Sequence, residues 1–524
     1  MTNSHCHRRN LLQRVYRFWA RRLSMPFGIA SSLCAALQIG HNPHVSRKAR
    51  LPAQCVAPKA VTFLCLPRNL QEEILRLLPT KDRVRAVPLV CTQLTATTRA
   101  DCPIWEELVI DAQVLGTCLN LDVLEAWLVT RGPAVSFLTI KDLKTWSEQS
   151  TESKVASLST GVISRIFIPC QACLKSLTIT ECGSLFAEAD FAALAALHQL
   201  QTLCIHTAAQ VHPCSVASLS SLTRLSSLSL MVAPGNRMDY GNISKYSGNH
   251  HSLMSLSTLT TLSLSGWTYL GRLPEAISSL SQLRELEICN CAMTSLPASL
   301  GRLSHLERID FHSNALGRSD DFTPADCLHG CTNLTSIKLS GNYFASVPAF
   351  LSSATALRCL HLANNHIGSS GNTACLAALT ALTKLVMQQC GLNTVPDSFA
   401  ALSNLQWLCM SRNSLSSIPD GLPWGKLTLL HLRGNELGAV PCSALASAAQ
   451  LHIVDCGENP PLQVNDYLKI WAVIKVLPLL HCLLIDKTGG ESMSMWTPVS
   501  ACNIAALKKL MKKRKRRVLL DPAV

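Results

Sequence analysis

Leucines recur along the second half of the chain in a fixed order, L-x-x-L-x-L-x-x-N/C. Three examples are "LERIDFHSN" (306–314), "LRCLHLANN" (357–365) and "LQWLCMSRN" (405–413). The L-x-L part alternates apolar and polar positions with a period of two, which predicts a short strand with one buried face. From Leu259 onward, successive units start 24, 23, 28, 23, 25, 23, 22 and 24 residues apart. A strand that recurs at this period predicts stacked repeats with a continuous core.

The ninth position is Asn or Cys in the units that follow the pattern most closely. Cys182, Cys291 and Cys390 replace Asn there. We expect a buried turn in which this side chain bonds backbone groups, since each unmade bond would cost ~1–3 kcal/mol. Second phrases such as "LPASLGRL" (296–303) predict an outer turn. Together these features resemble leucine-rich repeats, which implies an α/β solenoid with a parallel sheet on its concave face.

The repeat pattern extends, with interruptions, over residues 109–462. "EELVIDA" (106–112) predicts the first strand, and "VSFLTIKDL" (135–143) predicts an early repeat. Polar stretches at about 144–172 and 233–251 interrupt the pattern and are expected to be loop insertions on one face. Residues 463–500 do not continue the pattern with its ninth-position Asn, and they are expected to cap the end of the core.

A different pattern precedes the repeats, in "LPRNLQEEILRLLPTKDRVRAVPLVCTQL" (66–94). Leu70, Ile74 and Leu78 fall at helical spacing, and Pro79 ends the predicted helix. Residues 61–108 are too few to bury a sufficient core alone, so they are expected to keep an apolar face for another protein. This segment is therefore predicted to be a docking module.

The order and approximate spacing of these residues resemble an F-box, the helical motif that joins substrate receptors to the adaptor of SCF-type cullin-RING ubiquitin ligases. Asn69 and Leu94 depart from the family pattern. The resemblance implies a substrate-recognition subunit that contacts the adaptor, and through it a cullin, while the repeats hold a target. The implied adaptor-binding residues are Leu66, Pro67, Leu70, Ile74, Leu78, Val90, Cys91 and Trp105.

The formal net charge of +14 is concentrated at the two ends of the chain. Residues 1–71 hold eleven Lys or Arg and no acid, and residues 508–517 hold eight more. Removing these nineteen from the 47 bases leaves 28 bases against 33 acids, so the body is slightly acidic and no nucleic-acid partner is expected. Residues 1–60 are predicted to be a basic extension and residues 501–524 a basic tail.

The basic ends also bear on localisation. Lys512 to Arg517 resembles a nuclear import signal, so we expect the cytoplasm, the nucleus or both. Residues 1–40 are rich in Arg and lack acids, which leaves organelle targeting as an alternative. A cytoskeletal or axonemal location is the alternative that resemblance to other repeat proteins suggests.

The sequence predicts no catalytic, metal or cofactor site. Twenty-four cysteines are scattered through a long chain, which favours buried thiols in a reducing compartment over a disulfide framework. Cys170 and Cys173 lack a second pair at zinc-ribbon spacing. No G-x-x-x-x-G-K-[ST], H-E-x-x-H or G-x-S-x-G motif is present, so we expect no enzyme. No apolar run reaches the ~18 residues that a membrane span needs.

Side chains between the leucines are expected to leave the core and form the target-binding face. Trp407 is the most informative of them, because Trp and Arg dominate interface hot spots. We predict that an acidic or phosphorylated target segment binds this face, with Arg308, Arg358 and Arg412 accepting its charge. The predicted face consists of Arg284, Glu287, Arg308, Asp310, His312, Lys338, Arg358, His361, Lys384, Gln388, Trp407, Arg412, His431 and Arg433.

Two other functions are compatible with the same residues. The repeats could serve as a scaffold that binds a structural partner without ubiquitin transfer. They could also hold a small molecule, as in plant hormone receptors, which the array resembles. Co-purification of the adaptor distinguishes the first alternative, and ligand-dependent target binding distinguishes the second.

Overall fold

The computed structural model divides the chain into two compact units, Met1–Arg224 and Leu225–Val524, which are considered separately. It describes residues 106–111, 124–125, 128–129, 132–141, 163–180, 188–207, 217–232, 253–267, 270–318, 326–369, 372–438, 445, 448–459, 479, 482–484 and 517–519. Residues 61–105 of the predicted F-box-like module, which include all its predicted adaptor-binding residues, lie outside these ranges, as does the predicted insertion at 233–251.

The described residues of the first unit include four parallel strands that pair in sequence order. They are β1 (Glu107–Asp111), β2 (Phe137–Lys141), β3 (Ser176–Thr180) and β4 (Thr202–Thr207). The helices between and after them are η5 (Gly132–Ala134), α11 (Ser164–Phe167), η6 (Ile168–Cys170), α12 (Glu188–Leu194) and η8 (Ala217–Ser221). The predicted strands near residues 106 and 135 are thus present.

Part of the predicted insertion at 144–172 belongs to the repeat core. Ile163, Ile166, Phe167 and Cys170 are fully buried, and they are spaced i, i+3, i+4 and i+7. That spacing gives one apolar face to α11 and η6. The structure therefore differs from the expectation of a loop: residues 163–170 are the helical return segment that leads into β3.

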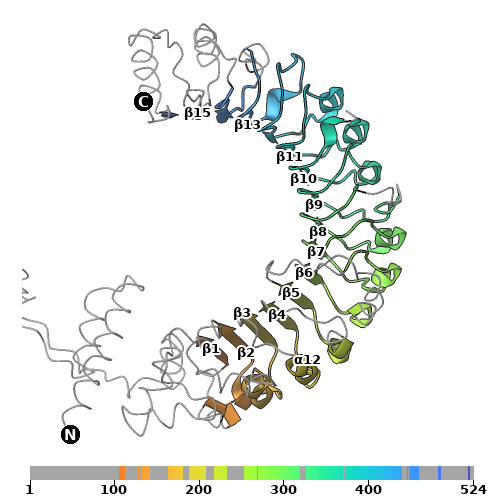
Figure 1. Ribbon diagram of the computed structural model, residues 1–524, viewed down its shortest axis with the longest axis vertical. Helices are drawn as coiled ribbons and strands as arrows, with labels where there is room; N and C mark the ends of the chain where they lie inside the picture. Colours follow the sequence, from red (N-terminus) through yellow and green to blue (C-terminus); the bar gives the residue numbers. More distant parts are fainter. Residues whose placement is uncertain are drawn as a thin grey trace, which may run out of the picture. The chain divides into compact units, whose positions relative to one another are not determined.

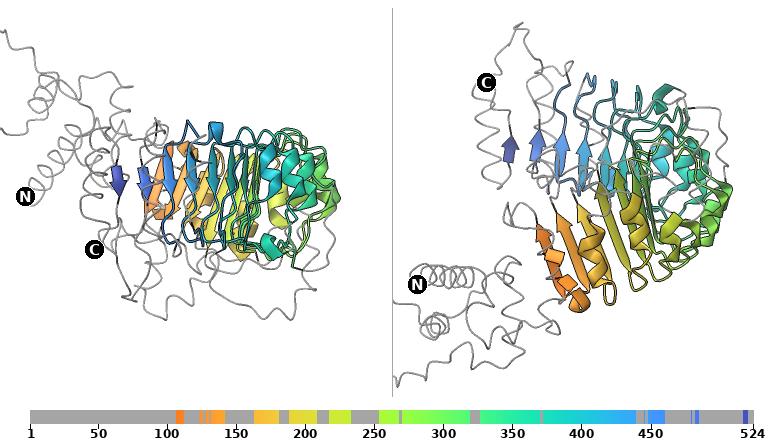
Figure 2. Two further views of the ribbon diagram at one scale, coloured as in Figure 1. Left: turned by 90° about the horizontal axis from the view of Figure 1, so that it is seen from above. Right: turned by 60° about the horizontal axis from the view of Figure 1, so that its bottom comes forward.

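The second unit continues the same construction with shorter strands, each pairing in parallel with the next (Figure 2). The strands are β5 (Ser227–Val232), β6 (Thr261–Ser265), β7 (Glu285–Cys289), β8 (Arg308–Asp310), β9 (Ser336–Lys338), β10 (Cys359–His361), β11 (Lys384–Val386), β12 (Trp407–Cys409), β13 (Leu429–His431), β14 (Ile453–Asp455), β15 (Cys482–Leu484) and β16 (Arg517–Leu519). The last two lie in the segments predicted as a cap and a basic tail.

On the side opposite the strands, the return segments of the second unit are 3₁₀ helices (Figure 1). Several begin directly after a proline with an extended or near-extended backbone, as at Pro274, Pro297 and Pro396, so the L-P-x-x-L phrase does form the outer turn. The helices are η11 (Glu275–Ser279), η12 (Ala298–Arg302), η13 (Ala349–Ser353), η14 (Ile367–Ser369), η15 (Ala374–Ala378), η16 (Asp397–Ala401) and η17 (Trp424–Lys426).

In the described units from Leu259 onward the ninth position forms a buried ladder, as the sequence predicted, whereas Cys182 lies outside the described residues. The amide of Asn342 donates to the carbonyl of Leu339 at 2.9 Å and to that of Phe311, in the preceding repeat, at 3.0 Å. The thiol of Cys390 reaches the equivalent carbonyl of Leu362 at 3.1 Å. Trp267 also occupies a ninth position, and its Nε1 donates to Leu230 at 3.2 Å. Leucine-rich stacking and this ladder together confirm the predicted solenoid with a parallel sheet.

Candidate functional site

The register of the strands arranges the outward-pointing side chains of the second unit in two columns, in which Cys409 and Asp455 are nevertheless buried. In each three-residue strand the middle residue is buried, so the first and third point away from the core. The first column runs through Glu285, Arg308, Ser336, Cys359, Lys384, Trp407, Leu429 and Ile453. The second column runs through Glu287, Asp310, Lys338, His361, Val386, Cys409, His431 and Asp455.

Eight residues of the predicted target-binding face lie in these columns. Arg308, Lys384 and Trp407 belong to the first, and Glu287, Asp310, Lys338, His361 and His431 belong to the second. The others flank the strands. Arg358 precedes β10, and Arg433 follows β13.

Arg412 lies in the turn after β12 rather than on the strand. Its backbone is left-handed, with φ 55°, and the equivalent positions in other repeats, such as Asn364 and Gln389, share that conformation. A left-handed residue cannot continue a strand, so the alternation used to place Arg412 ends before it. Its side chain is exposed and its stem lies beside Gly434, where an added Cβ would be 3.3 Å from Arg412 Cγ.

At the β7–β9 end of the columns, the basic side chains are paired with acids. Arg284 binds Glu307 at 2.5 Å, Arg308 binds Glu285, and Lys338 binds Asp310 at 2.7 Å. The hydrogen bond to Glu285 raises the pKa of Arg308. Arg308, which was expected to accept the charge of a target, is therefore already paired with an acid.

Acids also meet bases at the β13–β14 end. His431 Nδ1 lies 3.5 Å from Asp455, and Arg433 lies 2.9 Å from Glu458. Burial favours a higher pKa for Asp455, but bonds from His431 and the Gly457 amide outweigh it and hold that pKa below its ordinary value. The two ends of the columns are thus close to charge balance.

The β10–β12 repeats differ, because no acid among the described residues pairs with their cations. Lys384 Nζ lies 4.0 Å from the ring centroid of Trp407, which is 40% exposed. Within the described ranges, neither Arg358, Lys384 nor Arg412 forms an ion pair. We call Arg358, Lys384, Trp407 and Arg412 the cationic segment.

The pKa of His361, in the second column, is affected by the same cations. Burial, followed by the positive charges of Lys384 and Lys338, lowers the pKa of its imidazole to about 4, and Asp310 opposes this shift with the smallest contribution. The imidazole is therefore neutral near pH 7. Lys384 and Lys338 act on this pKa in the same direction as burial, as positive charge on this part of the face would.

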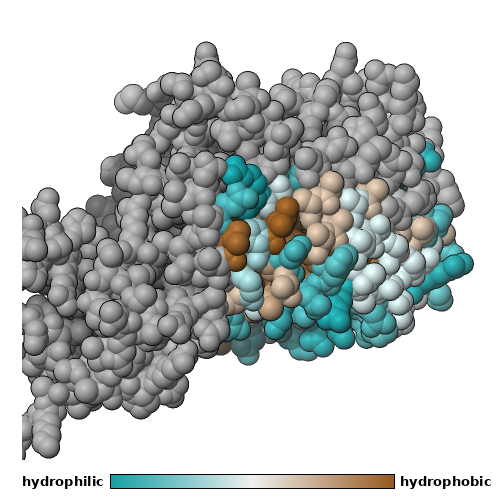
Figure 3. All heavy atoms as spheres, turned by 90° about the horizontal axis from the view of Figure 1, so that it is seen from below, coloured by the Kyte–Doolittle hydropathy of each residue, from teal (hydrophilic) through white to brown (hydrophobic). Residues whose placement is uncertain are grey.

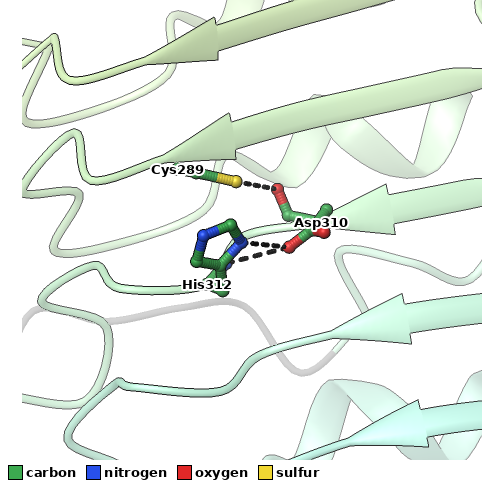
Figure 4. Close-up of side chains that lie close together, drawn as sticks. All are labelled: Cys289, Asp310 and His312. Atoms are coloured by element: carbon green, nitrogen blue, oxygen red, sulfur yellow. Dashed lines mark hydrogen bonds and ion pairs between the residues drawn. The ribbon is translucent and has the colours of Figure 1, made fainter. Parts of the chain in front are cut away.

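A group of potential metal ligands lies where β7 and β8 end (Figure 4). One ligand atom from each of Cys289, Asp310 and His312 lies within 4.8 Å of the others. His312 Nδ1 is 2.8 Å from Asp310 Oδ1. Sequence spacing missed the group because its members come from neighbouring repeats, although Asp310 and His312 were assigned to the target-binding face.

The Cys170–Cys173 pair carries no comparable arrangement. Cys170 is fully buried in the first unit, and burial raises the pKa of its thiol to about 12, whereas Cys173 is exposed. A thiol with that pKa stays protonated and unreactive at neutral pH. The prediction of buried thiols at this pair is thus confirmed for Cys170 and wrong for Cys173.

Exposed large apolar side chains are scattered through the described residues. They are Val129, Phe137, Ile168, Tyr343, Trp407 and Leu479. Figure 3 shows one face of the molecule on which hydrophilic and intermediate residues cover most of the described surface, with small separate hydrophobic spots. No helix among the described residues is long and apolar enough to cross a membrane.

Comparison with known proteins identifies repeat relatives. A family model of R13L1/DRL21 leucine-rich repeats matches residues 191–314. Mouse podocan-like protein 1 is 31% identical over 233 residues, covering 39% of this chain and 39% of that protein. Pig fibromodulin is 36% identical over 104 residues, covering 20% of this chain and 69% of the relative. The chain spans less than half the length of the podocan relatives it matches.

Solved structures resemble the chain at lower identity. An internalin from Listeria monocytogenes shares 16% identity with a TM-score of 0.41, over 73% of this chain and 94% of that one.

Proposed function

Because the chain is a leucine-rich-repeat protein, we propose that its cationic segment binds an acidic or phosphorylated stretch of a partner protein. Leucine-rich-repeat proteins generally bind other proteins, and strand faces of stacked repeats supply extended binding surfaces. The observation that carries the proposal is the exposed Trp407 with Lys384 stacked on it, in repeats whose cations lack acid partners among the described residues.

The chemistry of the cationic segment fits a mixed anionic and apolar ligand. Arg358 and Arg412 present guanidinium groups, which bind carboxylates and phosphates through two parallel hydrogen bonds. Trp407 supplies a large ring at low entropic cost, the property that makes Trp an interface anchor. The paired residues of β7–β9 and β13–β14 would then border the contact rather than form its centre.

The test is quantitative affinity capture by the full chain, comparing wild type with the Trp407→Ala, Arg412→Ala double variant. Loss of an aromatic anchor and a guanidinium should weaken capture by ~2 kcal/mol or more, roughly 30-fold. Tyr343→Ala is the matched control, because Tyr343 is 42% exposed but lies outside the strand columns. Equal capture by the double variant and wild type would reject the cationic segment as the contact.

A finer proposal concerns the assembly that the chain joins. The resemblance of residues 61–108 to an F-box supports a substrate-recognition subunit of an SCF-type ligase, in which those residues bind the adaptor and the repeats hold the target. The chain would position the target and perform no bond chemistry itself. Changing Leu66 and Ile74 to Glu should abolish co-purification of the adaptor while the repeats remain folded by circular dichroism.

The same measurement separates the alternative. If the wild-type chain captures a partner through the cationic segment but never the adaptor, it acts as a protein-interaction scaffold in the cytoplasm, on the cytoskeleton or in the axoneme. Nuclear location is proposed from Lys512 to Arg517, and organelle targeting from residues 1–40. Fusing residues 505–524, or residues 1–40, to a cytosolic reporter distinguishes these locations directly.

A further inference from the structure

We propose that Cys289, Asp310 and His312 form a zinc-binding site on the strand side of the second unit, with Glu287 as a neighbouring carboxylate. The site uses residues of two adjacent repeats. It is separate from the cationic segment, so neither proposal depends on the other.

The strand register explains how the four side chains come together. Glu287 and Asp310 are paired residues of β7 and β8. Cys289 and His312 each follow two positions later, and side chains two apart along an extended chain point the same way. Glu287, Cys289, Asp310 and His312 therefore form a two-by-two block. Its ligand atoms from Cys289, Asp310 and His312 lie within 4.8 Å of one another, close enough for small adjustments to place them around one ion.

Surrounding residues orient the carboxylates toward the centre of this block. Lys338 binds Oδ2 of Asp310 at 2.7 Å, which leaves Oδ1 facing His312. Ser263 donates to Oε2 of Glu287 at 3.1 Å, while Oε1 lies 3.7 Å from the Cys289 sulfur. Outer hydrogen bonds of this kind fix ligand orientation in metal sites.

The donor set and the local charge both suit zinc. Thiolate, imidazole and carboxylate are the protein ligands of Zn²⁺, and three of them leave a fourth position for water or Glu287. Two carboxylates flank a buried thiol here, and Lys338 balances one of them. Burial, then Asp310 and Glu287, raise the pKa of the Cys289 thiol, so it is protonated without metal. On binding, sulfur forms a bond to zinc and its proton passes to water.

A bound ion would link β7 to β8 and change the charge of the neighbouring face. The columns next to it carry the ion pairs Arg308–Glu285 and Lys338–Asp310. Adding two positive charges and releasing one proton leaves this end of the columns more positive by one unit. The site would thus act as a clamp between repeats with an electrostatic effect on the face.

Cobalt titration of the full chain tests the site, since Co²⁺ takes the same tetrahedral ligands and its thiolate charge-transfer absorption reports a sulfur bond. Wild type should gain one such site per chain, and Zn²⁺ should displace the cobalt. His312→Ala should weaken cobalt binding at this site at least about tenfold. Cys289→Ser should lose that one thiolate signal.

Cys359→Ser is the matched control, because Cys359 lies on the same face between Ser336 and Lys384, with no acid or histidine beside it in register. It should keep the wild-type signal. His312 is partly exposed, so His312→Ala still tests the site if Cys289→Ser fails to fold. Cobalt spectra that are the same for His312→Ala and wild type, or a Cys359→Ser variant that loses the signal equally, would overturn the site.

Discussion

The buried ladder and the strand columns of the second unit are built from the same repeats, yet they treat sequence variation differently. At the ladder, the side chains of Asn, Cys and Trp each donate to the equivalent backbone carbonyl of the repeat before them, as Asn413 does to Met387 at 2.9 Å. In the first column, equivalent positions hold residues as different as Glu285, Lys384 and Trp407. A side chain that must hydrogen-bond a buried backbone group can be one of only a few residue types, whereas a position that faces solvent can hold many.

This contrast assigns stability to the ladder and recognition to the columns. The carbonyls at the ladder are buried with the turn, and leaving one unpaired would cost the desolvation of that group. The column residues bond mainly to each other across the surface, in pairs such as Arg308 with Glu285. Exposed pairs of this kind contribute little to folding. Substitutions in the ladder should therefore lower the free energy of unfolding, whereas substitutions in the columns should change it little.

The largest effect is expected at the ladder, from Asn413→Ala. Asn413 accepts from the amides of Cys390 and Leu392 and donates to Met387 and Met410, so its loss leaves several buried groups unpaired. We expect a loss of about 3 kcal/mol in the free energy of unfolding, measured by urea denaturation.

Asn393→Ala is the control for that measurement, because Asn393 is an exposed asparagine in the same turn region. Its unfolding free energy should stay within about 0.5 kcal/mol of wild type. If the two alanine variants lose the same stability, the ladder does not hold the repeats together in the way proposed.

An intermediate effect is expected from pH, through His361 in the second column. Its pKa in the folded chain is lowered to about 4 from an ordinary 6.5, first by burial and then by Lys384 and Lys338. Between those values the unfolded chain binds the proton and the folded chain does not, so stability is lost as pH falls from about 6.5 to about 4. His361→Gln should remove on the order of 2 kcal/mol of that loss.

Parallel urea curves at several pH values measure the difference, and an NMR titration of His361 gives its pKa directly. Lys384→Ala should raise that pKa by removing a neighbouring positive charge. A His361 pKa that is the same in Lys384→Ala and in wild type would contradict the positive potential assigned to the β10–β12 repeats.

The smallest effect is expected from Arg308→Ala in the first column. Arg308 pairs with Glu285 on the exposed side of β8, where water screens the interaction. The unfolding free energy should change by less than about 1 kcal/mol, measured in the same urea assay. A loss as large as that of Asn413→Ala would show that the columns carry stability too, and the contrast with the ladder would fail.

Much of the repeat architecture was already determined by the order of residues. The L-x-x-L-x-L-x-x-N/C pattern predicted strands, ladder and outer turns, because each follows from which side chains a short unit must bury. Cys291 and Cys390 were correctly placed in the ladder for the same reason. Residues 163–170 were missed because their apolar spacing is helical and too short to stand out in a Ser-rich stretch.

Only the tertiary structure decided how side chains of different repeats meet. Sequence alternation identified the residues of the face, but pairing Arg308 with Glu285 while leaving Lys384 against Trp407 depends on the register between strands. Cys289, Asp310 and His312 converge for the same reason. A repeat's own sequence fixes what it buries, since burial is local, whereas charge pairing and metal geometry depend on atoms a repeat apart that only stacking brings within a few ångströms.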